Sequence, residues 1–203
     1  MRGRIFPRAL SAIRLGGRRR TGARGASLDA VLPERRRLDE KLDRLTTVDE
    51  LTGLANRRGL REHFEREHSL VDRNRVEAAL LVIDVEGTAT NLDAESTDEL
   101  VRYVAVVLRA ELRGSDTLAR LEGRRFAVIL PAATAVEAAA VAAKLGEAIA
   151  SRELDLAGRP HRPSAAAGVA AILPESLITL DRAIAEAEQA LAAQKGRAPQ
   201  PKK

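Results

Sequence analysis

The sequence predicts an α+β fold of the ferredoxin-like class, in which a central, mostly antiparallel sheet is flanked by helices. The first observation is a continuous apolar run from Ala78 to Val85, whose length and composition are typical of a buried strand. The second is a pair of short strand-like segments around the turn at 122–125, which predicts a hairpin. The third is the order strand, helix, strand, strand, helix, strand, which is that of a split βαβ unit with helices on one face of the sheet.

Each element follows from a local pattern. From Leu28 to Leu45 apolar residues recur at helical spacing, which predicts a linker helix over residues 28–46. This pattern is too short for a free-standing coiled coil, so we expect the helix to pack on the body or to pair within a dimer. The later elements are expected, in order, to be a helix from Asn56 to about His68, the strand Ala78–Val85, a helix over Asp98–Leu112, strands at Thr117–Leu121 and Phe126–Leu130, a helix over Thr134–Ala150, a strand at Ala165–Ile172 and a helix over Leu177–Gln194.

Composition limits the classes of function. The 203 residues suffice for one compact domain with a short extension, and no run of about 18 apolar residues predicts a membrane-spanning helix. Cysteine is absent, which excludes disulfides, thiolate nucleophiles and cysteine-ligated metal sites. With three histidines a multi-histidine metal site is not expected, and an aromatic content of 2% argues against stacking on nucleic-acid bases. The core is therefore expected to consist of Ala, Leu, Val and Ile.

Charge is unevenly distributed along the chain. Residues 1–27 contain eight arginines and no acid, Ala193 to Lys203 carry four cations and no acid, and residues 28–192 have a net charge of −7. Residues 1–27 are predicted to form a basic mobile arm and residues 198–203 a disordered basic tail. The arm either contacts anionic membrane or nucleic acid through phosphates, or is a solubilising tail or an upstream stretch from a misplaced start codon. Because its apolar residues are interrupted by charges and proline, export is disfavoured and a cytoplasmic location is expected.

The opening of the body carries a long sequence match. Residues 47–58, TVDELTGLANRR, resemble the DxLTGLxNRR opening of GGDEF domains, the family of bacterial diguanylate cyclases. The order of the following elements agrees, and the resemblance assigns residues 47–197 to this domain. It implies a nucleotidyl-cyclase palm fold, in which two GTP-loaded domains face each other and each 3′-hydroxyl attacks the other's α-phosphate to give cyclic di-GMP. In the family, acidic residues hold metal ions that neutralise the triphosphate and activate the hydroxyl.

The signature hairpin departs from the family pattern. Where the family has GG(D/E)EF, this chain has Glu122, Gly123, Arg124, Arg125 and Phe126, so that only the second glycine and the phenylalanine are kept. Both acids that supply metal coordination and catalysis in the family are arginines here, and a guanidinium cannot be a metal ligand. The resemblance therefore implies a degenerate site with no catalytic residue and no cofactor, and Mg²⁺ only if the domain is an active cyclase.

Other positions of the nucleotide site match in part. Asp84 matches the metal-binding aspartate, and the two hairpin arginines are expected to repel Mg²⁺ and to be able to pair with this carboxylate instead. Asp98 matches the guanine-contacting aspartate and Lys195 the phosphate-contacting lysine, which makes both nucleotide-binding candidates. Asn91 is a candidate for the guanine-binding asparagine, but four residues of the intervening loop are missing relative to the family, which leaves this assignment open.

One further family element is intact. The product-inhibition site of the family is RxxD, five residues before the signature, and Arg113 and Asp116 have this spacing relative to Glu122. An arginine can form a fork with a guanine edge or a phosphate, and an aspartate can accept the guanine N1 and N2 protons. The alternative is structural, because an arginine at a helix C-terminus interacts favourably with the helix dipole and Gly-Ser-Asp is ordinary turn chemistry.

The polar residues of the opening sequence have a structural interpretation. Asp49 is expected to cap the short turn that starts at Glu50, and Asn56 to cap the helix that follows it. In the alternative, Arg57 or Arg58 reaches a nucleotide or a ligand of the RxxD element in a partner domain.

These features predict a degenerate GGDEF domain without cyclase activity, which acts as a cyclic di-GMP sensor or as a partner-docking signalling module. The alternatives are an active diguanylate cyclase and a purely structural dimerisation domain. Cyclic di-GMP or GTP is the expected small-molecule partner. A second copy of the chain or a signalling protein is the expected macromolecular partner.

Overall fold

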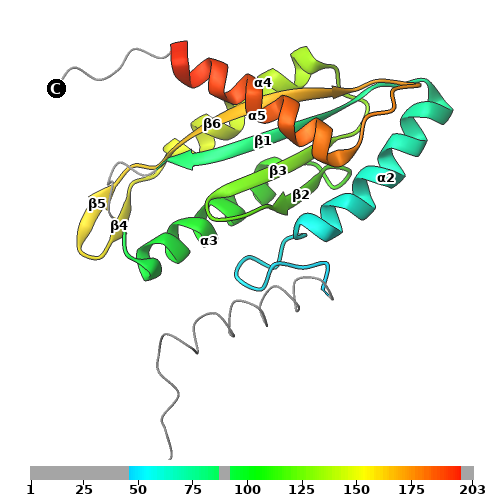
Figure 1. Cartoon of the computed structure of the whole chain (residues 1–203). Coiled ribbons are helices and arrows are strands. Elements are labelled where there is room, and N and C mark those ends of the chain that lie inside the picture. Colours follow the sequence, from blue (N-terminus) through cyan, green and yellow to red (C-terminus); the bar gives the residue numbers. More distant parts are fainter. Residues whose placement is uncertain (1–45, 87–91, 198–203) are drawn as a thin grey trace, which may run out of the picture. The chain divides into compact units, whose positions relative to one another are not determined.

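The structure is a computed structural model that describes residues 46–86 and 92–197 (Figure 1). The predicted arm, the predicted tail, Asn91 and all but the last residue of the predicted linker helix lie outside the described residues. The elements are, in order, α2 (Arg57–Asn74), β1 (Ala78–Glu86), α3 (Ala94–Glu111), β2 (Thr117–Arg120), β3 (Arg125–Leu130), α4 (Ala135–Ala150), β4 (Leu154–Leu156), β5 (Arg159–His161), β6 (Ser164–Ile172) and α5 (Leu180–Arg197). None of the helices in the described ranges is both long enough and apolar enough to cross a membrane.

A four-stranded antiparallel sheet lies at the centre of the domain, with the strand order β2-β3-β1-β6. β1 pairs along its whole length with β6, from Ala78 opposite Ile172 to Glu86 opposite Ser164. Its other edge pairs with β3, and β3 forms the predicted hairpin with β2. This topology confirms the predicted α+β class with an antiparallel sheet flanked by helices.

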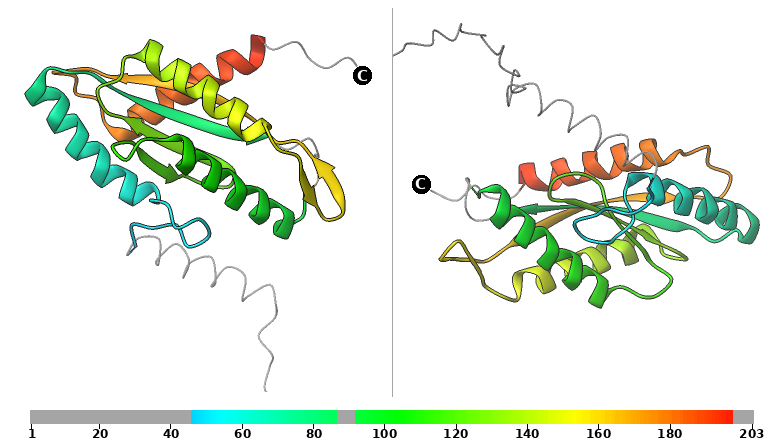
Figure 2. Two further views of the ribbon diagram at one scale, coloured as in Figure 1. Left: turned by 180° about the vertical axis from the view of Figure 1, so that it is seen from behind. Right: turned by 90° about the horizontal axis from the view of Figure 1, so that it is seen from below.

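Helices cover both faces of the sheet, so the expectation of helices on one face is wrong (Figure 2). α3 and α4 pack on one face, and α2 and α5 pack on the other. The reason lies in β1, where Leu81 and Ile83 face α3 and α4 while Leu80 and Val82 face α2 and α5. A strand that is apolar at consecutive positions needs a covering layer on each side.

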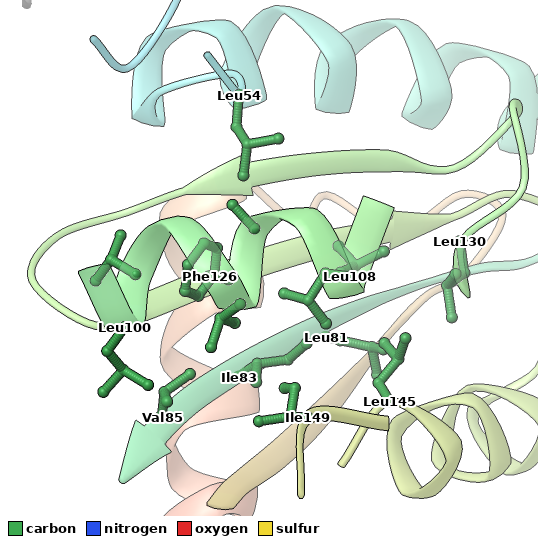
Figure 3. Close-up of a cluster of buried hydrophobic side chains, with 14 of the residues drawn as sticks. Leu54, Leu81, Ile83, Val85, Leu100, Leu108, Phe126, Leu130, Leu145 and Ile149 are labelled. Atoms are coloured by element: carbon green, nitrogen blue, oxygen red, sulfur yellow. The ribbon is translucent and has the colours of Figure 1, made fainter. Parts of the chain in front are cut away.

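The core on the α3 and α4 side is aliphatic (Figure 3). Phe126 is the one aromatic ring among the buried members of this cluster. β1, α3 and α4 supply seven of its other large members, namely Leu81, Ile83, Val85, Leu100, Leu108, Leu145 and Ile149, and Leu54, Leu130 and Leu156 join them from other segments. The expected core of Ala, Leu, Val and Ile is therefore confirmed.

Several local features differ from the prediction. α2 runs to Asn74 and not to about His68, and α5 spans Leu180–Arg197 and not Leu177–Gln194. α3 begins at Ala94 and not at Asp98, because Asp93 caps it by accepting the Ser96 N–H at 2.8 Å. The small hairpin of β4 and β5 was missed, since each strand has three residues and the segment reads as a polar loop. Its turn residues 157 and 158 both have positive φ, 53° and 75°, as a type I′ turn requires.

α5 approaches β6 closely at Gly168. A Cβ added to Gly168 would fall within van der Waals contact of the Ala187 carbonyl oxygen and lie 2.6 Å from the Leu191 backbone nitrogen. The absence of a side chain therefore allows the helix backbone to lie directly on the strand. This contact fixes the position of α5, whose last turns reach the end of β1.

Candidate functional site

The C-terminal end of β1 carries two carboxylates on one face of the sheet. Because side chains alternate along a strand, Asp84 and Glu86 continue the row of Leu80 and Val82, which faces α5. The side chains of Asp84 and Glu86 are 27% and 52% exposed. Both carboxylates are therefore partly accessible to solvent.

Lys195, near the end of α5, bridges these two carboxylates. Its Nζ lies 2.8 Å from Asp84 Oδ2 and 2.5 Å from Glu86 Oε1. Desolvation alone would lower the pKa of Lys195, but hydrogen bonds and charge attraction from the two carboxylates together raise this pKa above its usual value of 10.5. The ammonium is therefore charged at neutral pH. The structure thus brings together Asp84, which the resemblance matched to the metal-binding aspartate, and Lys195, which it matched to the phosphate-contacting lysine.

The signature hairpin turns through Gly123, whose φ of 53° lies in the left-handed region. The Arg125 N–H donates to the Glu122 carbonyl at 2.9 Å, and the first central residue of this turn has a positive φ, as in a type II′ turn. The carbonyl of Arg124 accepts the Val85 N–H at 3.2 Å. The second glycine of the family signature is thus required here by the backbone.

The hairpin arginines do not pair with Asp84, so this expectation is wrong. Arg125 lies opposite Asp84 in the register of β3 and β1, but its Nη1 is 3.1 Å from Glu188 Oε1 of α5 and 3.6 Å from Glu122 Oε1. No ion pair joins either hairpin arginine to Asp84 within the described ranges. The physical reason is that Lys195 already neutralises Asp84, while Glu188 offers Arg125 an acid of its own.

Arg120 connects the opening sequence to the hairpin, and the sequence analysis missed it. Its Nη1 lies 3.0 Å from Asp49 Oδ2, and its Nε and Nη2 donate to the Gly123 carbonyl at 3.1 and 2.9 Å. The other oxygen of Asp49 accepts the Thr52 N–H and hydroxyl, which confirms the predicted capping role. The side chains of Arg120 and Asp49 are 15% and 21% exposed, so this pair is largely buried. A charge at the end of a short apolar strand is the signal that could have found Arg120.

The arginines of the opening sequence belong to α2. Asn56 caps this helix, since its side chain accepts the N–H groups of Arg58 and Gly59 at 3.0 Å, as predicted. Arg57 Nη2 lies 2.8 Å from Asp181 Oδ1 at the start of α5. Arg57 therefore ties α2 to α5.

A groove of about 550 Å³ lies beside the edge strand β6, between α4 and α5. Its walls consist mainly of small side chains, Ala139, Ala142, Ala143 and Gly146 of α4 and Ala165, Ala166 and Ala167 of β6. Glu86 and Lys195 also line it. The groove therefore opens beside the two-carboxylate cluster.

Of the two predicted nucleotide contacts within the described residues, Asp98 and Lys195, the structure places Lys195 at the end of β1. Asp98 lies in the second turn of α3 and is partly exposed. In the part of the chain that the structure describes, no hydrogen bond or ion pair joins Asp98 to Asp84 or Lys195. The guanine-contacting role of Asp98 stays a prediction.

Arg113 and Asp116 form a turn at the opposite end of the sheet. The Arg113 N–H donates to Asp116 Oδ2 at 2.8 Å, and the Asp116 N–H donates to the Arg113 carbonyl at 3.1 Å. Thr117, the next residue, is aligned through β3 with Leu80, four residues and about 13 Å along the strand from Asp84. The side chain of Arg113 is exposed, so it is available to a ligand.

The residues at the end of β1 do not fit the Mg²⁺ that the family signature implies. In residues 46–86 and 92–197, no group of three or more Asp, Glu or His side chains is arranged to hold a metal ion. The two signature acids are arginines, and the carboxylates of Asp84 and Glu86 already hold an ammonium.

Sequence comparison identifies the family. The family model described as "Diguanylate cyclase, GGDEF domain" matches residues 46–199. The chain belongs to the GGDEF domain family. "Probable diguanylate cyclase DgcE" of Escherichia coli K12 is 30% identical over 156 residues, 73% of this chain and 14% of DgcE. "Diguanylate cyclase DgcP" of Pseudomonas aeruginosa is 32% identical over 136 residues, 66% of this chain and 20% of DgcP. The chain spans about a fifth or less of the length of these relatives.

Solved structures of GGDEF proteins share the fold. Diguanylate cyclase SiaD from Pseudomonas aeruginosa, in complex with its activator SiaC, superposes with a TM-score of 0.68 and 24% identity, covering 83% of this chain and 65% of SiaD. The FimX GGDEF domain from the same species has a TM-score of 0.67 and 20% identity, over 75% of this chain and 96% of that domain. The coiled coil and GGDEF domain of DgcB from Caulobacter crescentus, in complex with c-di-GMP, has a TM-score of 0.64 and 25% identity, over 84% of this chain and 95% of that one.

Proposed function

We propose that this GGDEF domain has no cyclase activity and acts in cyclic di-GMP signalling as a binding module. The observation that carries the proposal is the hairpin, where Arg124 and Arg125 replace both signature acids while Lys195 engages Asp84. Two-metal catalysis on GTP needs carboxylates that hold divalent ions against the triphosphate. Inverting the charge at two of these positions removes the ligands and adds repulsion toward the metal.

The ligand that we propose is cyclic di-GMP, bound at Arg113 and Asp116. Asp116 uses Oδ2 for the Arg113 N–H, and since a carboxylate has about four acceptor positions, capacity is left for the N1 and N2 protons of a guanine. The exposed Arg113 guanidinium supplies a two-pronged donor for a phosphate or for the guanine edge. The c-di-GMP complex of the DgcB domain, which is 25% identical to this chain, supports this class of ligand.

Cyclic di-GMP is favoured over GTP because the two ligands make different demands on the site. GTP at Asp98 and Lys195 would require the ammonium to leave both of the carboxylates that it bridges. A ligand at Arg113 and Asp116 requires no such rearrangement. The output of the bound domain would be a changed affinity for a second copy or for a signalling protein.

Calorimetry with the full chain and cyclic di-GMP tests this proposal. We expect micromolar or tighter affinity, which Arg113→Ala weakens by about 1.5 to 3 kcal/mol, or about 10- to 150-fold, because a charge-assisted hydrogen bond is lost. Arg109→Ala is the matched control, since Arg109 is also exposed, lies in the last turn of α3 just before the turn that holds Arg113, and should leave the affinity unchanged.

One result would contradict the sensor role, and another would contradict the assignment of the ligand to Arg113. If the wild-type chain gives neither heat nor a thermal shift at high ligand concentration, the structural dimerisation domain takes its place. Equal affinities of the wild type and Arg113→Ala would move the ligand away from the RxxD turn.

A further inference from the structure

We propose that Lys195 is the built-in cation of a two-carboxylate site formed by Asp84 and Glu86, and that its ammonium keeps divalent metal ions out of the domain. The residues present at Asp84 disagree with the Mg²⁺ that the family implies there. Exclusion of the metal depends on neither cyclic di-GMP nor GTP.

The first step is the geometry of the carboxylates. Strand alternation places Asp84 and Glu86 on the same face of β1, and both are within 3 Å of one nitrogen atom, at 2.8 and 2.5 Å from Lys195 Nζ. An ammonium is a compact point charge with three donors, so it can satisfy both acids at once. The arrangement of two oxygens around one cation is therefore complete without a metal ion.

The second step is the charge pattern of α5. Glu188 and Lys195 are two helical turns apart and so lie on the same face of the helix. Glu188 pairs with Arg125 of β3 at 3.1 Å, while Lys195 pairs with the acids of β1. A basic residue of the hairpin thus pairs with an acid of α5, and the two acids of β1 pair with a base of α5. Each of these acids therefore has a basic side chain of the chain itself as its partner, although the single ammonium of Lys195 serves both Asp84 and Glu86.

The ammonium of Lys195 competes with a divalent ion for the two carboxylates. A divalent ion at Asp84 and Glu86 must displace the Lys195 ammonium, which both carboxylates hold. Replacing Lys195 by a neutral residue leaves two carboxylates without their cation, and Arg125 does not take its place because Glu188 holds it. Two carboxylates with water as the other ligands are a usual site for hard divalent cations.

Titration with Mn²⁺ in the absence of nucleotide tests the proposal. Binding is measured by calorimetry and by the loss of the electron spin resonance signal of free Mn²⁺. The wild-type chain should not bind Mn²⁺ at millimolar concentration, whereas Lys195→Gln should bind it with a dissociation constant of about 0.1 to 1 mM, as expected for a weak oxygen-ligand site. Lys144→Gln is the matched control, since Lys144 pairs with Glu111 at 2.9 Å away from β1, and it should behave as the wild type. Adding Asp84→Asn to Lys195→Gln should abolish the binding.

The proposal is overturned if the wild type binds Mn²⁺ as tightly as Lys195→Gln, or if folded Lys195→Gln binds none. If Lys195→Gln is largely unfolded, the same ion gives the answer, because Mn²⁺ should then replace the missing charge and raise the thermal midpoint of the variant. A midpoint that does not respond to Mn²⁺ rejects the proposal. A negative result in the Mn²⁺ titration does not affect the cyclic di-GMP assay, since that assay measures binding at Arg113 and Asp116, at the opposite end of the sheet.

Discussion

Replacing Gly168 by alanine is predicted to push α5 away from β6 and to destabilise the domain. The added Cβ would overlap the Ala187 carbonyl oxygen and lie 2.6 Å from the Leu191 nitrogen. These are backbone atoms of a helix, so they cannot rotate aside as a flexible side chain could. Overpacking of this kind costs about 1 to 3 kcal/mol, and we expect the upper end of this range.

The net change in stability of Gly168→Ala also includes a smaller, stabilising contribution from conformational entropy. Alanine loses less conformational freedom than glycine on folding, which returns about 0.5 to 1 kcal/mol. The expected loss in the free energy of unfolding is therefore about 2 kcal/mol, or about 4 to 8 °C in the thermal midpoint for a domain of this size. Urea unfolding followed by circular dichroism measures the free energy directly.

Gly146→Ala is the matched control for this substitution. A Cβ at Gly146 of α4 would lie 3.6 Å from the Ala165 carbonyl oxygen, which is an ordinary contact. Alanine in a helix interior is favoured over glycine by about 0.5 to 1 kcal/mol, so the control should be stabilised. If Gly168→Ala were as stable as the wild type, the close contact of α5 and β6 would be refuted.

Four other substitutions test three separate contacts. Thr134→Ala removes the capping box of α4 and should cost about 1 kcal/mol in urea unfolding. Asp49→Ala and Arg120→Ala should each cost about 1.5 to 3 kcal/mol and be non-additive in a double-mutant cycle, because each removes the same largely buried charged hydrogen bond. A hydrogen bond from Arg57 lowers the pKa of Asp181, so its contribution to stability is present above the usual value of 3.8 and is lost as the pH falls through the lower folded pKa. Asp181→Asn should thus be less stable than the wild type at neutral pH and equal to it in strong acid.

Local patterns were sufficient to predict the order of the helices and of the strands of the four-stranded sheet. The run Ala78–Val85 has the length and composition of a buried strand, and Gly123 between two short apolar segments indicates a hairpin. The same run is apolar at consecutive positions, which indicates that both faces of the sheet are covered by helices. The prediction of helices on one face did not take this into account. The hairpin of β4 and β5 gave no comparable signal, because three-residue strands show no periodicity.

The pairings in the site could not be predicted in the same way. Lys195 and Asp84 are separated by 111 positions, and Arg125 and Glu188 by 63, so no local spacing connects them. The sequence offered Asp84 as a partner with which the hairpin arginines could pair, because local patterns do not show how α5 crosses the sheet. That crossing depends on the close approach of α5 to Gly168. The sequence does not show this approach, because it involves backbone atoms of Ala187 and Leu191.

Incubation of the purified chain with GTP and Mg²⁺ or Mn²⁺ is the most direct test of the central claim, that the domain lacks cyclase activity. Chromatography of the nucleotides should reveal no cyclic di-GMP, because the hairpin supplies arginines where the metal ligands of a cyclase belong. A chain of an active relative, assayed in parallel, establishes that the conditions support turnover. Formation of cyclic di-GMP by the wild type, lost on Asp84→Ala, would contradict the account.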